Sequence, residues 1–281
     1  MILLILLFAL AARTDTPAGC RVELEGLDAT LFVPEGYEVN SSGVVDILMH
    51  LHGSTSVIEP AIKDSGLNSV LIAFNRKGLS KVYAEPFTDP ALFNTLLNSA
   101  ISTLKAQKIM ENPKLGRVVI SSFSAGFGGV RAMIKVPATF ARIDGLIMAD
   151  SIYCGYTGDP ANHTVDPALM GGFRRFAIEA AEGRKTFLLT HSAQVPEGYA
   201  STTETANFLI QALGSGTIDK LQDWGPGLTQ TRDFKKGKFS VLGFSGKEAA
   251  DHMAHLRRIG PFWKRYCDIS DRRGSSTPPS P

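Results

Sequence analysis

The sequence predicts an α/β fold with a mostly parallel eight-stranded sheet and helices on both faces. Short apolar runs rich in β-branched residues recur, and from the middle of the chain onward they alternate with segments of helical period. A parallel neighbour can be reached only through a crossover connection, so this alternation indicates parallel pairing. The first two runs have no helix between them, and we therefore expect them to pair antiparallel at one edge of the sheet.

The eight strands are expected near residues 22–27, 30–33, 44–49, 70–74, 118–120, 146–149, 186–190 and 240–244. Helices are expected at residues 91–107, 126–134, 168–182, 203–213 and 250–266. Asp89-Pro90 precedes the first helix and supplies a capping side chain and a proline suited to the first helical turn. Residues 214–238 contain Gly225-Pro226-Gly227 and are expected to form a long irregular connection.

A length of 281 residues and a hydrophobic fraction of 44% allow one large domain with a sizeable core, which we expect at residues 20–268. Residues 1–12 form an unbroken apolar stretch that ends in Ala9-Leu10-Ala11. A bilayer span takes roughly 20 apolar residues, so this shorter stretch predicts a signal peptide and a secreted or periplasmic protein. A misassigned start codon or a buried strand is the alternative. A disordered tail is expected at residues 269–281, where Ser, Pro and Arg accumulate.

The 29 basic and 27 acidic residues nearly balance, with a net charge of +2. This balance gives no reason to expect a nucleic acid or an anionic membrane as partner. Cys20, Cys154 and Cys267 are too few and too scattered for a metal site, and no metal or organic cofactor is expected. In an exported protein one pair could form a disulfide, although the sequence does not identify the pair. Lipid attachment at Cys20 is a further option.

Three serines and three glycines lie close together in residues 121–129. The apolar run 118–120 leads into Ser122-Phe123-Ser124-Ala125-Gly126, and a helical segment follows. A serine at the tip of a tight strand-to-helix turn needs small residues two positions before and after it, which Ser124 has. A dinucleotide fingerprint is excluded because Arg131 stands where it needs glycine or alanine, and a phosphate loop because Gly-Lys-Ser or Gly-Lys-Thr is absent. A small-residue turn packed on the sheet is the structural alternative.

This segment resembles the nucleophile elbow of the α/β-hydrolase superfamily, whose usual pattern is G-x-S-x-G and whose first glycine is Ser122 here. The resemblance implies a Ser124 nucleophile and the chain order serine, acid, histidine. It also implies that an oxyanion is held by the N–H groups of Ala125 and of Ser54 or Gly53. The His52-Gly53 pair after the third strand is similar to the superfamily's His-Gly motif.

The same resemblance implies a base after the last strand and an acid at a strand end. His252 follows the strand 240–244 and is the expected base, whereas His255 is expected to be a surface or packing residue. Asp150 directly follows the strand 146–149 and is the expected acid. Glu197 and Glu204 are weaker candidates, and Asp150 could alternatively cap its own loop.

Phe127, Tyr153 and His191 are expected to line the substrate pocket, with His52 bracing its loop. His191 follows a strand at the edge where open α/β sheets bind ligands, although hydrogen bonding within its own loop is an equal alternative. Further candidate walls are Tyr83, Phe87 and Tyr156. Residues 151–167 are too few for a large cap domain, so we expect an open site suited to bulky or polymeric esters.

We therefore expect an exported serine esterase that needs no cofactor. Because the histidine base must be neutral, activity should rise through roughly pH 6 to 7. A peptidase or amidase with the same residues, or a non-catalytic binding protein on the same fold, is the alternative.

Overall fold

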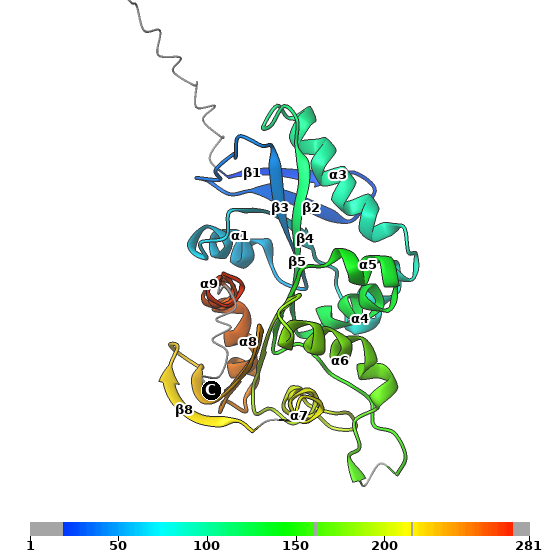
Figure 1. Ribbon diagram of the computed structural model, residues 1–281, viewed down its shortest axis with the longest axis vertical. Coiled ribbons are helices and arrows are strands. Elements are labelled where there is room, and N and C mark those ends of the chain that lie inside the picture. Colours follow the sequence, from blue (N-terminus) through cyan, green and yellow to red (C-terminus); the bar gives the residue numbers. More distant parts are fainter. Residues whose placement is uncertain (1–18, 160–161, 215, 272–281) are drawn as a thin grey trace, which may run out of the picture.

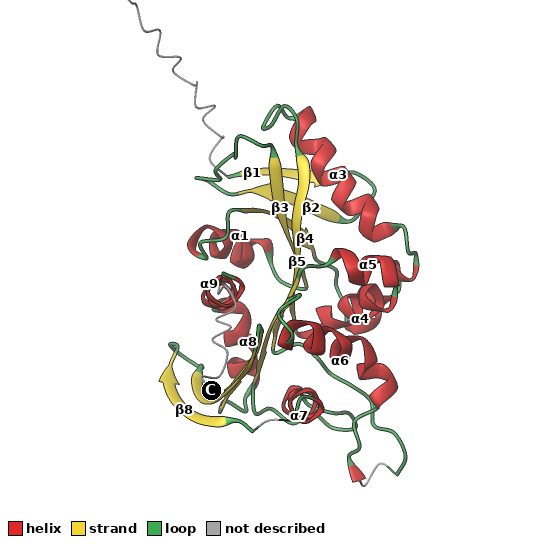
Figure 2. Cartoon of the chain, viewed as in Figure 1, coloured by secondary structure: helices red, strands yellow, loops and turns green. Residues whose placement is uncertain are grey.

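One mixed β-sheet runs through the molecule (Figures 1 and 2). The computed structural model describes residues 19–159, 162–214 and 216–271. In these ranges ten strands lie in the order β1-β2-β4-β3-β5-β6-β7-β10-β9-β8. Their bounds are β1 (Cys20–Leu24), β2 (Ala29–Val33), β3 (Val44–Leu51), β4 (Ser69–Phe74), β5 (Lys114–Phe123), β6 (Gly145–Ala149), β7 (Thr186–His191), β8 (Ile218–Asp223), β9 (Thr229–Lys236) and β10 (Phe239–Phe244).

The centre of the sheet is parallel and both edges are antiparallel. Strands β4, β3, β5, β6, β7 and β10 pair parallel with one another. β1 pairs with β2, and β2 pairs with β4, in antiparallel register, and so do β10 with β9 and β9 with β8. The predicted mostly parallel sheet and its antiparallel leading pair are confirmed. The predicted count of eight strands is wrong, because β8 and β9 extend the sheet to ten.

β8 and β9 lie in the segment that the sequence predicted to be irregular. No side chain of β8 is buried, and β9 buries only Gln230 and Phe234. Leu221, in the middle of β8, is 85% exposed. A strand at the sheet edge with both faces largely in solvent lacks the apolar alternation by which a strand is recognised, so its sequence looks like a loop.

Nine α-helices occur in the described residues. Their bounds are α1 (Thr55–Asp64), α2 (Ser80–Ala84), α3 (Leu92–Ala106), α4 (Phe127–Lys135), α5 (Pro137–Arg142), α6 (Pro167–Ala181), α7 (Thr202–Ala212), α8 (Ala249–Arg257) and α9 (Ile259–Ser270). The sequence missed α1, which carries Pro60 in its interior, and the short helices α2 and α5. The last predicted helix is two helices, since Arg258 between them has non-helical dihedrals (φ −111°, ψ 26°). α9 continues to Ser270, so the first two residues of the expected tail are helical.

The helices cover both faces of the sheet and create two apolar cores. Figure 1 shows α1, α8 and α9 on one side and α3 to α7 on the other. Successive residues of a central strand enter opposite cores: Leu48 packs with Trp263 on the α9 side, and Met49 packs on the side of α3 to α7. A strand buried on both faces reads as a continuous apolar run, which is why the central strands were predictable.

No helix in the described ranges is long and apolar enough to cross a membrane. The predicted signal peptide at residues 1–12 lies outside the described residues and stays a prediction, as does the tail beyond residue 271.

Candidate active site

The register of the central sheet brings the predicted site residues to one edge. Leu51 at the end of β3 pairs with Ser122, and Phe123 at the end of β5 pairs with Ala149, the last residue of β6. The next residues along each chain segment are His52, Ser124 and Asp150. Because these strands are parallel, their carboxyl ends meet at the same edge, where open α/β sheets bind ligands.

Each of these three strands, β3, β5 and β6, is followed by a residue with a strained, left-handed backbone conformation. His52, Ser124 and Asp150 have φ values of 67°, 45° and 44°, and they are three of only six non-glycine residues with positive φ in the described ranges. This left-handed conformation is uncommon for non-glycine residues and concentrates at functional sites. It turns the chain sharply off each strand, so that the three side chains leave the sheet at its carboxyl edge.

The turn that carries Ser124 is packed as the elbow hypothesis requires. A short 3₁₀ turn, Ser124–Gly126, leads directly into α4. A Cβ atom at Gly126 would lie 2.4 Å from the carbonyl oxygen of Leu51, so only glycine lets the turn approach β3 this closely.

Ser122 is buried and fits where the superfamily pattern has glycine. Ser151 Oγ donates to the carbonyl oxygen of Ser124 at 2.8 Å. Ser122 Oγ, 2.6 Å from Ser151 Oγ, therefore donates to it. The serine at this position thus helps to hold the backbone of the turn.

Ser124, His252 and Asp150 form one hydrogen-bonded chain. His252 Nδ1 lies 2.7 Å from Asp150 Oδ2, and His252 Nε2 lies 2.8 Å from Ser124 Oγ. An ionised carboxylate only accepts hydrogen bonds, so Nδ1 carries the proton and Nε2 is free to accept from the serine hydroxyl. His252 is the fourth residue of α8, and its ring stacks on Phe123 with centroids 4.6 Å apart.

Asp150 is fully buried and saturated with donors. Its Oδ1 accepts from the Ser192 N–H at 2.8 Å and from Thr202 Oγ1, while Oδ2 faces His252. Burial works to raise the pKa of Asp150, but the adjacent His255 and the hydrogen bonds from His252 and Thr202 outweigh it, and its pKa lies well below the ordinary value. The carboxylate is therefore ionised and faces the imidazole.

The other acid and base candidates lie elsewhere. His255 is fully buried with Nδ1 2.8 Å from Thr190 Oγ1, and burial lowers its pKa to about 4, so it is a packing residue. Glu197 is exposed. Glu204 forms the capping box of α7 with Ser201 and accepts from the Tyr156 hydroxyl. Neither glutamate contacts His252 or Ser124 through a hydrogen bond in the described residues.

Of the three candidate oxyanion donors only Ala125 lines the cavity beside Ser124. The Gly53 N–H donates to Asn75 Oδ1 at 3.3 Å and is therefore engaged, and the role of the Ser54 N–H stays a prediction. His52 braces this loop: its Nδ1 is 2.8 Å from the hydroxyl of Tyr83, which itself donates to the carbonyl of Arg76. Burial and the charge of His252 lower the pKa of His52.

A cavity of about 460 Å³ opens beside Ser124 and His252. Phe127 and Tyr153 line it, whereas His52 does not. Tyr83 and Phe87, considered as walls, are buried in the core. The full lining is Leu79, Ser80, Ser124, Ala125, Phe127, Arg131, Tyr153, Cys154, Gly155, Gln194, Tyr199 and His252.

His191 also lies outside the cavity lining, in its own polar cluster. Its Nδ1 contacts the carbonyl of Ser192 at 2.9 Å, and its Nε2 accepts from Arg232 Nε at 2.8 Å. Burial and the charge of Arg232 lower its pKa to about 4. His191 thus bonds to its own loop, the alternative that the sequence left open, and also to an arginine on β9 that the sequence did not place beside it.

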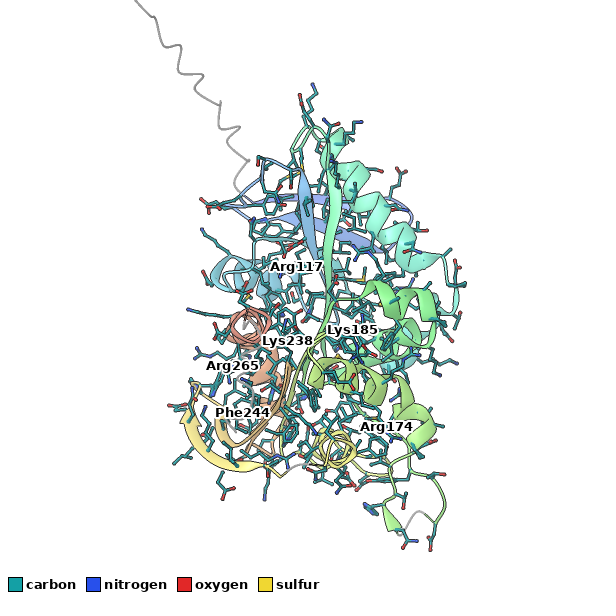
Figure 3. All side chains as sticks on the ribbon, in the orientation of Figure 1. Arg117, Arg174, Lys185, Lys238, Phe244 and Arg265 are labelled. Atoms are coloured by element: carbon teal, nitrogen blue, oxygen red, sulfur yellow. The ribbon has the colours of Figure 1, made fainter. Side chains whose placement is uncertain are left out.

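A larger cavity of about 640 Å³ lies between α1, α9 and the strands β8 and β9. Its lining includes Trp224 and Arg265, the latter visible on the α9 side in Figure 3, but no serine, cysteine or histidine. Of these two cavities, only the smaller one is therefore lined by a serine with a histidine in hydrogen-bond reach. Cys20, Cys154 and Cys267 are all free, so the disulfide that the sequence left open is not formed.

The sequence missed several residues of the site. Thr202 and Ser192 support Asp150 from segments far away in sequence, and no local pattern marks them. Arg131 lines the cavity, and the sequence could have predicted this. It stands four residues after Phe127 on the same helix and therefore lies on the same helix face.

The sequence matches no family model and no curated protein. Solved structures with a similar fold include an uncharacterised protein from Capnocytophaga ochracea DSM 7271, at 9% identity over 88% of this chain and 64% of that one (TM-score 0.45). The AtxE2 isopeptidase has 12% identity over 88% of this chain and 39% of its own (TM-score 0.42). A ferulic acid esterase has 10% identity over 89% of this chain and 97% of its own (TM-score 0.46).

This chain spans less than two thirds of the length of the first two of these structures. The superfamily resemblance rests on the topology of this chain itself. A parallel sheet whose strand ends carry Ser124 on a tight turn, then Asp150, then His252 after the last strand is α/β-hydrolase-like, as the sequence resemblance implied.

Proposed function

We propose that this protein is a serine hydrolase that cleaves carboxylic esters through an acyl-enzyme. One observation carries the proposal: the chain of hydrogen bonds from Ser124 Oγ through His252 to the buried carboxylate of Asp150, at 2.8 and 2.7 Å, with the serine on a strained turn facing a cavity. A serine, a base within hydrogen-bond reach and a group that orients the base are the parts that nucleophilic catalysis needs.

In the first half of the proposed reaction, Ser124 Oγ attacks the ester carbonyl while His252 Nε2 accepts the hydroxyl proton. Asp150 stabilises the imidazolium that results. The N–H groups of Ala125 and Ser54 bind the oxyanion of the tetrahedral intermediate. As that intermediate collapses, His252 gives its proton to the departing alcohol, and the acyl group stays on Ser124.

In the second half, water attacks the acyl-enzyme. His252 accepts a proton from the water, and a second oxyanion forms at the same two N–H groups. Collapse expels the Ser124 oxygen, which recovers its proton from His252, and the carboxylic acid leaves. Each half uses the same base, and no bound cofactor takes part in either step.

The proposed substrates are bulky or polymeric esters. The cavity walls contributed by Phe127, Tyr153 and Tyr199 form an aromatic edge, and Tyr199 is 44% exposed. Such an edge suits a flat or bulky group better than a long alkyl chain. Rates on sugar-linked or aromatic esters should exceed those on long-chain triglycerides, and equal rates on both would contradict this part of the proposal.

A fluorophosphonate probe tests the nucleophile directly. It should label the intact protein and the Ser80→Ala variant, which removes the other serine of the cavity lining, but not Ser124→Ala. Labelling that persists in Ser124→Ala would overturn the assignment. Absence of labelling in the intact protein would favour a non-catalytic binding protein.

An ester and an amide with the same acyl group separate esterase from peptidase activity. Both substrates would use Ser124 and His252, so only the relative rates are informative. The proposal expects the ester to be cleaved faster, and cleavage of the amide alone would select the peptidase alternative.

Export is proposed as well, on the apolar stretch at residues 1–12 alone. Expression with and without this stretch, followed by measurement of protein outside the cytoplasm, tests it. Equal distribution of the two forms would contradict export through this segment.

A further inference from the structure

The cavity beside Ser124 contains one charged side chain without a charged partner. Arg131 lines the cavity, and no Asp or Glu does. Within the described ranges no carboxylate forms an ion pair with Arg131. The one acid that measurably influences its pKa is Asp166, whose Oδ1 accepts from Ala168 and Leu169 and so caps α6.

The guanidinium of Arg131 is held over the ring of Phe127, which also lines the cavity. Its centre lies 4.7 Å from the centroid of that ring, one helical turn earlier on α4. One of its terminal nitrogens donates to the carbonyl of Tyr153. These two contacts fix the guanidinium between the Phe127 ring and the backbone of Tyr153.

Arg131 remains a hydrogen-bond donor in need of an acceptor. Its Nε is buried and has no hydrogen-bond partner among the described residues. Burial lowers its pKa, with Cys154 and Asp166 opposing, yet a guanidinium stays protonated at every physiological pH. A partly desolvated cation without a directly paired carboxylate is costly, and an anionic ligand that pairs with it removes much of that cost.

We propose that Arg131 is a substrate-binding residue that selects esters carrying a carboxylate a few bonds from the scissile carbonyl. This inference rests on the proposed esterase function and names its substrate class. The carboxylate pairs with the guanidinium while the scissile carbonyl lies at Ser124, and the aromatic walls contact the linking chain. Gln194 and Ser80 also line the cavity, but both are neutral and cannot replace the charge.

Two isosteric substrates isolate the charge. One is the 4-methylumbelliferyl monoester of adipic acid, with a free terminal carboxylate, and the other is the same ester with a terminal carboxamide. After subtraction of uncatalysed hydrolysis, the intact protein should favour the carboxylate in kcat/KM. In Arg131→Met that preference should fall by about 10- to 100-fold, the usual range for a charge-assisted hydrogen bond, mainly through KM. Arg131→Lys should restore part of the preference.

Arg175 provides a matched control. It also lies over an aromatic ring, with its guanidinium 3.7 Å from the Phe140 centroid, and it also donates to a backbone carbonyl, that of Ile134. It does not line the cavity. Arg175→Met should leave the preference for the carboxylate unchanged. The inference would be overturned if the intact protein had equal kcat/KM for the two esters. It would also be overturned if Arg131→Met lowered kcat/KM equally for both.

A binding measurement separates this inference from the proposed function. The adipate monoester binds but should not be cleaved in Ser124→Ala, and its affinity should fall at least tenfold when Arg131→Met is added. If the intact protein hydrolyses neither ester, the esterase proposal fails, but an Arg131-dependent affinity still supports the anion site. An affinity that does not depend on Arg131 refutes the anion site even where hydrolysis is observed.

Discussion

Among the described residues, two serine–histidine hydrogen bonds involve serines only three positions apart, Ser121 on β5 and Ser124 on the turn after it, and they have opposite surroundings. Ser121 Oγ lies 2.9 Å from His50 Nδ1 and accepts from the indole N–H of Trp263 at 2.8 Å, all inside the core on the α9 side. Ser124 Oγ lies 2.8 Å from His252 Nε2 at the cavity. The two distances are nearly equal, so distance alone does not distinguish them.

The difference lies in the third partner and in access. His252 bonds a buried carboxylate, Asp150, through its other nitrogen. The third partner of the Ser121–His50 pair is instead Trp263, whose indole N–H bonds to Ser121 and can only donate. Burial lowers the pKa of His50 to about 3, so this histidine stays neutral and cannot shuttle a proton. A serine–histidine bond therefore indicates catalysis only where an acid can stabilise the imidazolium and a substrate can reach the serine.

The largest expected effect comes from exchanging the two serines for alanine. Ser124→Ala should lower kcat by about 10⁴-fold or more with little loss of stability, because only the nucleophile is removed. Ser121→Ala should leave kcat within a few-fold but destabilise the fold by about 1–3 kcal/mol, since it leaves buried donors unpaired. Ester turnover and urea midpoints measured on both variants check this. A large loss of activity in a stably folded Ser121→Ala variant would contradict the claim that only the Ser124–His252 pair is catalytic.

Removing Asp150 should leave the Ser124–His252 pair without an acid, as the Ser121–His50 pair is. Asp150→Asn keeps the shape but favours the wrong imidazole tautomer and no longer stabilises the imidazolium, so kcat should fall by about 10³- to 10⁴-fold. Stopped-flow acylation rates with an activated ester measure this. The assignment of Asp150 fails if the variant retains more than a tenth of the activity while Glu204→Gln loses it.

The buried histidines predict a loss of stability in acid. Burial lowers the pKa of His50 to about 3 and those of His191 and His255 to about 4, against about 6.5 in the unfolded chain. Between these values the unfolded state binds more protons, so the free energy of unfolding is full above pH 6.5 and decreases as the pH falls toward 4.

Urea unfolding from pH 7 to pH 4 tests this dependence. The slope should be shallower in a His50→Gln variant that still folds. A midpoint that stays constant from pH 7 to pH 4 would show that these three histidines are not held neutral. Asp150, with its lowered pKa, adds a further loss only below about pH 4.

The smallest effect should come from removing one hydrogen bond that orients Asp150. Thr202→Val removes the hydroxyl that donates to Asp150 Oδ1, while the Ser192 N–H bond to the same oxygen remains. The carboxylate would be less well oriented, and kcat should fall by about 3- to 10-fold, which corresponds to one ordinary hydrogen bond. Thr205→Val is the control, since Thr205 Oγ1 bonds only backbone carbonyls. Equal losses in both variants would point to α7 packing instead.

Local sequence predicted those elements whose residues face a core on a regular period. All the strands of the parallel centre and helices α3, α4, α6 and α7 were predictable because burial leaves an apolar pattern in each. β8 and β9 were not, since their side chains are mostly in solvent, and neither was the break at Arg258 between α8 and α9. Ser124 was found because a tight turn demands small neighbours, a constraint within five residues.

The sequence by itself determined the parallel core, the Ser124 turn and the order serine, acid, histidine, because each depends on local periodicity or on chain order. Only the tertiary structure decided that Asp150 rather than Glu204 faces His252, that His191 bonds to Arg232 on β9, and that Arg131 enters the cavity without a counter-ion. These outcomes depend on contacts between residues 20 to more than 100 positions apart. Such contacts are set by strand register and helix packing, for which a short stretch of sequence carries no mark.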